Sequence, residues 1–162
     1  MNDCITITVA GMISDPKFHR SRAIAMALYE AHSEKIACPI IMEFFETQWE
    51  QFLKKTANTY KGVFYEHKAS PLVYLAKNNE YIGDGEDFSM WALHNFNQKD
   101  NSKFTEYQKC ANDALCNKIN DQKDTRQYAQ LTFKIGKEQS EFGCIEEAVI
   151  IELFKDICPK TV

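Results

Sequence analysis

The junction between the first strand and the first helix constrains this chain most strongly, because it sets the order and spacing of two elements. From Cys4 to Ala10, β-branched and small residues alternate, and this pattern predicts a buried strand that ends in a turn at Gly11. Ser14-Asp15-Pro16 then offers a side-chain cap and a proline suited to the first helical turn. Apolar residues at helical spacing predict that this helix runs to about His32.

Strand and helix patterns continue to alternate after this junction. We expect a strand over Pro39 to Phe45, followed by a helix that Thr47 caps and that ends before Gly62. A strand over Leu72 to Ala76 then leads through a turn at Asn78-Asn79 into a short strand at Tyr81-Ile82. The last helix of this series is expected from Asp84-Gly85-Glu86-Asp87 through Phe96. The predicted order is β-α-β-α-β-β-α, which belongs to the α/β class. Aromatic residues on the apolar faces of the later helices are expected in the core, namely Trp49, Phe52, Phe88 and Trp91.

A change to polar composition at Gln98 to Ser102 predicts a domain boundary. Residues 1–97 are therefore expected to form one domain. An apolar stripe from Phe104 to Leu115 predicts a connecting helix within residues 98–126, and the charged stretch Asn120 to Arg126 is expected to break it.

Beyond this break, the composition of residues 127–162 predicts strands. Ala129 to Ile135 and Ala148 to Phe154 are apolar and β-branched, and we expect them to form two strands joined by a polar loop. A two-stranded hairpin is only marginally stable alone. We therefore expect either that the native chain continues past Val162 or that these strands dock on another surface.

Charged residues are scattered along the chain, with 19 Lys and Arg against 23 Asp and Glu. No basic stripe is present that could follow a phosphate backbone, so nucleic acid is not an expected partner. No apolar run approaches the roughly 20 residues that span a bilayer, and the N-terminus lacks the basic and apolar regions of a signal peptide. We therefore expect no membrane partner and a cytoplasmic, reducing compartment.

Cysteines and histidines are the residues that could supply thiol chemistry or hold a metal. The cysteines form no C-x-x-C pair and no zinc-like spacing with histidine, so we expect free and mostly buried thiols at Cys4, Cys38, Cys110, Cys116, Cys144 and Cys158. The histidines form no i, i+4 pair, so we expect surface or hydrogen-bonded side chains and no metal site at His19, His32, His67 and His94.

The order of elements, with Ser70-Pro71 before the third strand and Gly83-Asp84 before the last helix, resembles the glutaredoxin branch of the thioredoxin fold. The resemblance covers about Cys4 to Asn97. In that family the proline at the position of Pro71 is usually cis, which lets the preceding backbone pair with a substrate peptide or with glutathione. A simple strand-start proline is the alternative, and the sequence does not distinguish the two isomers.

The C-P-x-C motif of that family, where a helix N-terminus lowers the pKa of a thiol, reads Asp15-Pro16-Lys17-Phe18 here. An aspartate cannot perform thiol exchange, and we expect Asp15 to cap the helix instead. Asp84 falls where the family commonly has a second glycine beside the carboxylate of glutathione, and it adds a like charge. The resemblance thus predicts a degenerate site without a catalytic residue or cofactor, made of Asp15, Pro16, Lys17, Phe18, Ser70, Pro71, Gly83 and Asp84.

The end of the sequence resembles the first hairpin of cyclophilins, which typically reads F-x-I-x-I-G and then R-I-V-x-E-L-F-x-D-x-x-P-K-T. Leu131 to Gly136 correspond to the first string. The residues that match the second string are Glu152, Leu153, Phe154, Asp156, Pro159, Lys160 and Thr161. The loop from Lys137 to Glu147 is long, and Glu147 stands where a basic residue is common. The resemblance implies that residues 127–162 open a cyclophilin-type barrel whose isomerase residues would come from strands after Val162.

A degenerate glutaredoxin-like domain followed by a cyclophilin is similar to the peptidyl-prolyl isomerase-like proteins of ciliated cells, in particular the "isomerase-like six" family. The strings V-A-G-M-I-S-D-P-K-F and Y-I-G-D-G-E-D-F-S-M-W-A fit its N-terminal region. The first domain also resembles the N-terminal segment of a malate-dehydrogenase-like protein of ciliated cells. No dinucleotide glycine motif occurs, so dehydrogenase activity is not implied.

Three functions follow as hypotheses. The first is a non-catalytic, protein-binding module with a groove near Asp15, Ser70, Pro71 and Gly83 that is suited to an extended peptide. For this function the resemblance implies the ciliary axoneme, a radial spoke or a similar large assembly, with other proteins as partners and no small-molecule substrate. The second is the targeting region of an active peptidyl-prolyl isomerase. The third, a thiol-disulfide oxidoreductase, would require an exposed cysteine of low pKa, which we do not expect.

Overall fold

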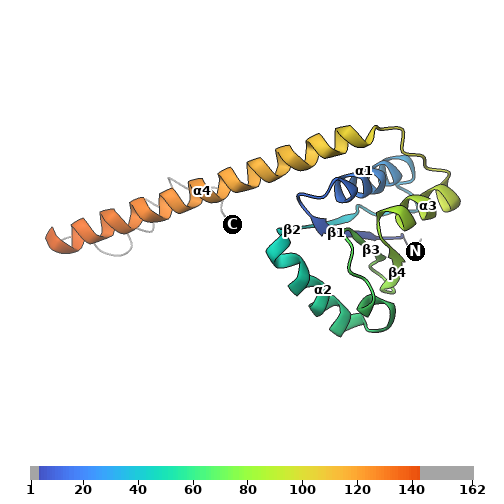
Figure 1. Ribbon diagram of the computed structural model, residues 1–162, viewed down its shortest axis with the longest axis horizontal. Coiled ribbons are helices and arrows are strands. Elements are labelled where there is room, and N and C mark those ends of the chain that lie inside the picture. The colour runs from blue at the N-terminus through green and yellow to red at the C-terminus, as the bar shows by residue number, and fades with distance from the viewer. Residues whose placement is uncertain (1–3, 143–162) are drawn as a thin grey trace. The chain divides into compact units, whose positions relative to one another are not determined.

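The computed structural model describes residues 4–142 of the 162. The chain divides into two units, Met1–Leu115 and Cys116–Val162. The first unit holds a mixed sheet with helices on both of its faces (Figure 1). The fold class is therefore α/β, as the sequence predicted.

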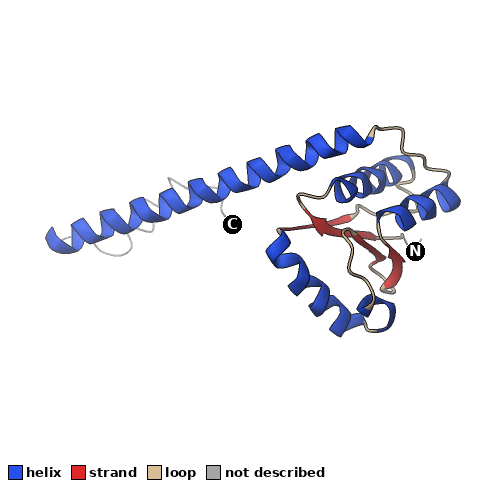
Figure 2. Cartoon of the chain, viewed as in Figure 1, coloured by secondary structure: helices blue, strands red, loops and turns tan. Residues whose placement is uncertain are grey.

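The sheet of the first unit has four strands in the order β2-β1-β3-β4 (Figure 2). Their bounds are β1 Ile7–Met12, β2 Ile40–Phe44, β3 Leu72–Leu75 and β4 Glu80–Gly83. β1 pairs with β2 in parallel and with β3 antiparallel, and β4 pairs antiparallel with β3. β1 lies in the middle of the sheet, and its residues from Ile7 to Gly11 are buried. β2 and β4 form the two edges.

Helices cover the sheet in two layers. α1 (Pro16–Ala31) and α3 (Gly85–Phe96) lie on one face, where Phe18, Leu28 and Phe88 are buried against Ile7 and Val9 of β1. The other face is covered by α2 (Glu46–Tyr60) and the short 3-10 helix η1 (Gly62–Tyr65), as the core around Trp49 and Phe64 shows. Each face therefore has its own hydrophobic core, and β1 contributes to both.

The predicted order β-α-β-α-β-β-α is confirmed, and the differences are local. α2 begins at Glu46 rather than after a cap at Thr47, because the side chain of Gln48 accepts a hydrogen bond from the Phe45 amide at 3.2 Å. The sequence did not predict η1. The turn expected at Gly11 lies instead at Ile13 and Ser14, because Gly11 and Met12 still pair with β2. Of the four aromatic residues expected in the core, Trp49 and Phe88 are buried and Phe52 and Trp91 are partly buried.

The last described element is α4, a single helix over Phe104–Phe142. The prediction of a break at Asn120 to Arg126 is wrong, and so is that of a strand over Ala129 to Ile135, because both segments are helical. No glycine or proline occurs between Phe104 and Ile135, and extending an existing helix costs far less than starting one. The first part of the cyclophilin-like hairpin, Leu131 to Gly136, is therefore helical here and not a strand. The expected strand Ala148 to Phe154 and the motif residues from Glu152 to Thr161 lie outside the described residues.

Candidate functional site

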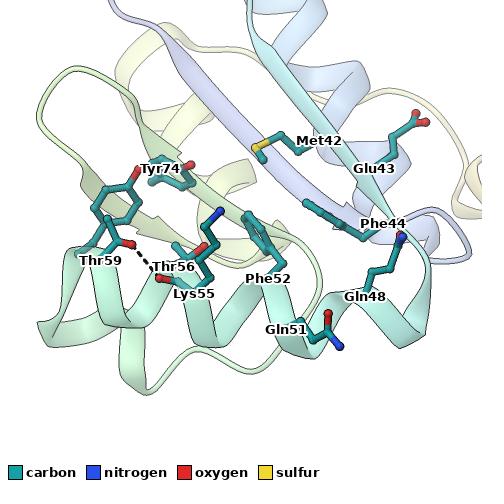
Figure 3. Close-up of a pocket in the computed structure, with 11 residues that line it drawn as sticks. Met42, Glu43, Phe44, Gln48, Gln51, Phe52, Lys55, Thr56, Thr59 and Tyr74 are labelled. Carbon is teal, nitrogen blue, oxygen red and sulfur yellow. Dashed lines mark hydrogen bonds between the residues drawn. The ribbon is translucent and has the colours of Figure 1, made fainter. Parts of the chain in front are cut away.

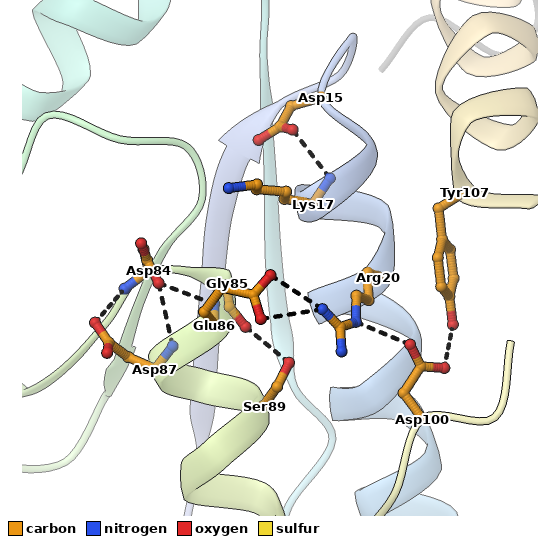
Figure 4. Close-up of polar contacts among 10 residues, drawn as sticks. All are labelled: Asp15, Lys17, Arg20, Asp84, Gly85, Glu86, Asp87, Ser89, Asp100 and Tyr107. Atoms are coloured by element: carbon orange, nitrogen blue, oxygen red, sulfur yellow. Dashed lines mark hydrogen bonds and ion pairs between the residues drawn. The ribbon is translucent and has the colours of Figure 1, made fainter. Parts of the chain in front are cut away.

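The N-terminus of α1 carries the positions where a glutaredoxin-like protein would have its two cysteines. Asp15 is the N-cap residue, and its Oδ1 accepts a hydrogen bond from the Lys17 amide at 2.9 Å (Figure 4). The other oxygen, Oδ2, is buried and has no hydrogen-bond partner among the described residues. Pro16 starts the helix and Lys17 is exposed. The predicted capping role of Asp15 is confirmed.

Phe18, at the second cysteine position, points into the core. Its side chain is fully buried and packs against Gly11 of β1 so closely that a Cβ on Gly11 would lie 2.5 Å from Phe18 Cδ2. Gly11 is therefore needed because its missing side chain leaves room for the Phe18 ring. An apolar ring therefore occupies the position that the resemblance matches to the second cysteine.

Ser70 and Pro71 lie beside this helix terminus. The Ser70–Pro71 peptide bond is cis, which agrees with the resemblance. The Ser70 hydroxyl accepts a hydrogen bond from the Met12 amide at the end of β1, with the two atoms 3.0 Å apart. This bond joins the segment before β3 to the turn that leads into α1.

The N-terminus of α3 is capped by its own carboxylates. Asp84 Oδ1 accepts hydrogen bonds from the amides of Glu86 at 2.9 Å and Asp87 at 3.1 Å, and Asp87 Oδ2 accepts one from the Asp84 amide at 3.3 Å (Figure 4). Gly83 has a φ of +136° and faces the Asp87 side chain, so a larger residue would be strained there and would also clash.

Gly85 shows that these segments meet. A Cβ on Gly85 would lie 3.5 Å from Lys17 Cβ and 3.4 Å from Pro71 Cδ. The structure thus brings the starts of α1 and α3 and the segment before β3 to one end of the sheet. At this end the partial positive charges of both helix termini face aspartate carboxylates. The site holds no cysteine, and the first-turn amides of Lys17, Glu86 and Asp87 already have intramolecular acceptors.

The cysteines in the described part of the chain are all exposed, so the prediction of buried thiols is wrong for Cys4, Cys38, Cys110 and Cys116. Cys4 and Cys38 precede β1 and β2, which are parallel, so both lie at the strand ends opposite the Met12 end, where Asp15 follows. The reason for the error is that both residues precede their strands, β1 beginning only at Ile7 and β2 at the exposed Ile40. Cys144 and Cys158 lie outside the described residues.

His67 supports the segment that leads to Ser70. Its Nε2 lies 2.7 Å from the Ala69 carbonyl oxygen and its Nδ1 lies 2.8 Å from the Tyr81 hydroxyl. The carbonyl can only accept, so the proton sits on Nε2 and Nδ1 accepts from Tyr81. Burial of the ring lowers the pKa of His67, although the backbone oxygens of Ala69 and Pro71 and the nearby Asp84 and Asp87 oppose the shift. His67 is therefore a neutral, hydrogen-bonded histidine in the folded protein.

The lowered pKa of His67 predicts a loss of stability in mild acid. The unfolded chain takes up a proton near the ordinary histidine pKa of about 6.5, whereas the folded chain does so only at lower pH. The free energy of unfolding should therefore fall as pH decreases below about 6.5. Urea unfolding of wild type and His67→Gln at a series of pH values measures this. Equal pH slopes for the two proteins would contradict the assignment.

Arg20 connects three helices, α1, α3 and α4, through contacts that no sequence pattern predicts. Its guanidinium donates to Glu86 at 3.1 Å and to Asp100 at 2.9 Å, and Asp100 also accepts from the Tyr107 hydroxyl at 2.8 Å (Figure 4). Burial alone would raise the pKa of Asp100, but the hydrogen bonds from Tyr107, the Ser102 amide and Arg20 together lower it. The network ties the start of α4 to α1 and α3.

Other features of the described residues add no cofactor site. No group of three or more His, Cys, Asp or Glu side chains in this part of the chain is arranged to hold a metal ion. None of the helices described is both long and apolar enough to cross a membrane. A groove of about 710 Å³ lies between β2 and α2, on the face of the sheet away from α1.

The chain is similar to mammalian proteins named "Probable inactive peptidyl-prolyl cis-trans isomerase-like 6". It is 25% identical over 157 residues to the Homo sapiens protein and 23% identical over 157 residues to the Mus musculus protein. Each alignment covers 97% of this chain and 47% of the relative, so the chain spans about half the length of these curated relatives. The similarity supports a relationship with this isomerase-like family. No family model matches the sequence.

Proposed function

We propose that this chain is a non-catalytic, protein-binding and structural module of a cyclophilin-like protein. The main support is that Asp15 and Asp84 cap the N-termini of α1 and α3 at the site. In an active thioredoxin-type enzyme such a terminus stabilises a thiolate, and here each terminus already has its own anion. The word "inactive" in the names of the mammalian relatives supports the same function.

The proposal includes a division of the chain. Residues 1–97 form a glutaredoxin-like domain, which the strand order β2-β1-β3-β4 with one parallel pair supports. Residues 98–126 lie in the linker that contains the first part of α4. The cyclophilin-like part rests on the motif residues between Glu152 and Thr161 and on the family of the relatives. We place the module in the ciliary axoneme, in a radial spoke or similar assembly, on the resemblance alone.

A direct test compares the wild-type chain with the variant Asp15→Cys/Asp84→Gly. In the variant, a thiol replaces one capping carboxylate and the other carboxylate is removed. Wild type should not catalyse thiol-disulfide exchange with glutathione beyond the uncatalysed reaction of its exposed cysteines. It should also show no saturable amide shifts at residues 15, 70 and 83 on glutathione titration. Alkylation at mildly acidic pH should label the new thiol of the variant, which serves as the positive control. Exchange activity or glutathione binding in wild type would overturn the proposal.

Protein binding is tested with the same wild-type chain as bait in axonemal extract. Partner capture should be specific and unchanged by reductant or glutathione, because no disulfide exchange is required. Capture that disappears on reduction would instead indicate mixed disulfides with the exposed cysteines. Absence of any specific axonemal partner would contradict the axonemal assignment.

A further inference from the structure

We propose that the free edge of β2, together with the groove beside α2, binds an extended segment of a partner protein as an added strand. The segment would carry apolar side chains at alternate positions and one carboxylate on the groove side. This inference rests on the proposed protein-binding function and goes further, because it places the partner away from the degenerate thioredoxin-type site.

The edge of β2 has main-chain groups available for pairing. β2 pairs only with β1 among the described strands. The Phe44 carbonyl oxygen accepts from the Ile13 amide at 2.9 Å, so the main-chain groups of Phe44 face β1. Because these groups alternate in direction along a strand, those of Ile41 and Glu43 face outward. Ile40, at the start of this edge, is 45% exposed.

The groove supplies a place for apolar side chains on one side of an added strand. Met42 and Phe44 from β2 and Phe52 from α2 point into it (Figure 3). The rings of Phe44 and Phe52 stack with their centroids 4.4 Å apart, and Tyr60 and Tyr74 also line the groove. A volume of about 710 Å³ is enough for several side chains of an extended peptide.

The two faces of β2 differ at this edge, and the difference predicts which side chains a bound segment should carry. Ile41 packs against the core under α1, and Glu43 pairs with Arg22 at 2.9 Å. An added strand would therefore meet an apolar groove on one face and a charged rim on the other. Side chains of a strand alternate between faces, so the matching segment has apolar residues at every second position.

Lys55 adds a charge requirement. It is exposed on α2, lines the groove, and forms no ion pair with any carboxylate that the structure describes. The other polar residues of α2 along the groove are neutral, namely Gln48, Gln51, Thr56 and Thr59. Glu43 borders the groove, but its side chain lies on the opposite face of β2 and is already paired with Arg22. A carboxylate on the groove side of the partner could therefore form an ion pair with Lys55.

The test uses the full 162-residue chain labelled with ¹⁵N and a synthetic peptide, acetyl-Thr-Ile-Thr-Val-Thr-Glu-Thr-amide. Two control peptides carry N-methyl groups on alternate residues, one on the Thr set and the other on the Ile, Val and Glu set. We expect slowed amide exchange at Ile41 and Glu43 with the parent peptide. Only one of the two methylated peptides should lose binding, because only one set of amides faces β2.

Exchanging the two charges tests whether Lys55 pairs with the carboxylate of the bound peptide. Lys55→Glu should weaken binding of the parent peptide by about fivefold, and a peptide with Lys in place of Glu should recover that loss. Equal loss of binding with both methylated peptides, no binding, or binding that protects only residues 15, 70 and 83 would overturn this inference. Concentration-dependent protection of Ile41 and Glu43 without peptide would assign the edge to a second copy instead. The proposed function fails separately, in the glutathione and capture experiments.

Discussion

Replacement of Phe18 by alanine should lower the free energy of unfolding by about 3–5 kcal/mol. Phe18 is fully buried between α1 and the sheet, and its ring fills the space that Gly11 leaves open. Removing the ring leaves a cavity in the core that is shared by α1, α3 and β1. Urea unfolding followed by circular dichroism measures the loss, with Phe18→Leu as a milder control.

Gly11→Ala tests the same contact from the other side. The added methyl group would lie 2.5 Å from the Phe18 ring, so the substitution alone should cost about 1–3 kcal/mol. In the double variant Gly11→Ala/Phe18→Ala the methyl group enters the space left by the ring, and Gly11→Ala should then cost much less than it does alone. Additive losses would show that the two residues do not share this space.

The packing of Phe18 limits which cysteines the start of α1 could accept. Restoring both cysteines of a C-P-x-C motif would require Phe18→Cys, and the smaller side chain would leave much of the ring's volume empty. Restoring only the first, by Asp15→Cys, leaves the core intact and removes one cap of about 0.5–2 kcal/mol. The core thus accepts a single thiol at this helix terminus more readily than a dithiol.

Replacement of Arg20 by methionine should lower the free energy of unfolding by about 2–3 kcal/mol. The Asp100 side chain is only 9% exposed and would keep its charge without its ionic partner. Glu86 pairs with the same guanidinium, but its side chain is 61% exposed. Glu86→Gln should therefore lower the free energy of unfolding by less than about 1 kcal/mol, and it serves as the control. Hydrogen exchange at Tyr107 and Ala111 should quicken in Arg20→Met, because the start of α4 loses its connection to α1.

The pH dependence of this network gives an independent check. The pKa of Asp100 is lowered, since hydrogen bonds from Tyr107, Ser102 and Arg20 outweigh the effect of burial. Its contribution to stability is present above the ordinary aspartate pKa and is lost as pH falls through the lowered value. Arg20→Met should show a shallower loss in acid than wild type, and Arg20→Met/Asp100→Asn should recover part of the stability. No recovery in the double variant would mean that Arg20 acts through packing alone.

The sequence alone determined the features of this protein that depend on neighbouring residues. The cap and proline at Asp15 and Pro16 and the cap at Asp84 each involve hydrogen bonds or dihedral angles within a few residues. Such short-range interactions can be predicted directly from residue order, and so could the order of the elements. Where local patterns competed, as in Ala129 to Ile135, the β-branched composition was misleading, because a continuing helix needs no strand partner.

Only the tertiary structure decided which distant residues meet. Arg20 and Asp100 are 80 positions apart, and Met12 and Ser70 are 58 apart. No local pattern in either segment specifies its partner. The exposure of Cys38 and the groove beside β2 likewise follow from β2 being an edge strand, which depends on how all four strands pair. Periodicity fixes which face of an element is apolar, but the positions of edges, grooves and ion pairs depend on long-range pairing and packing.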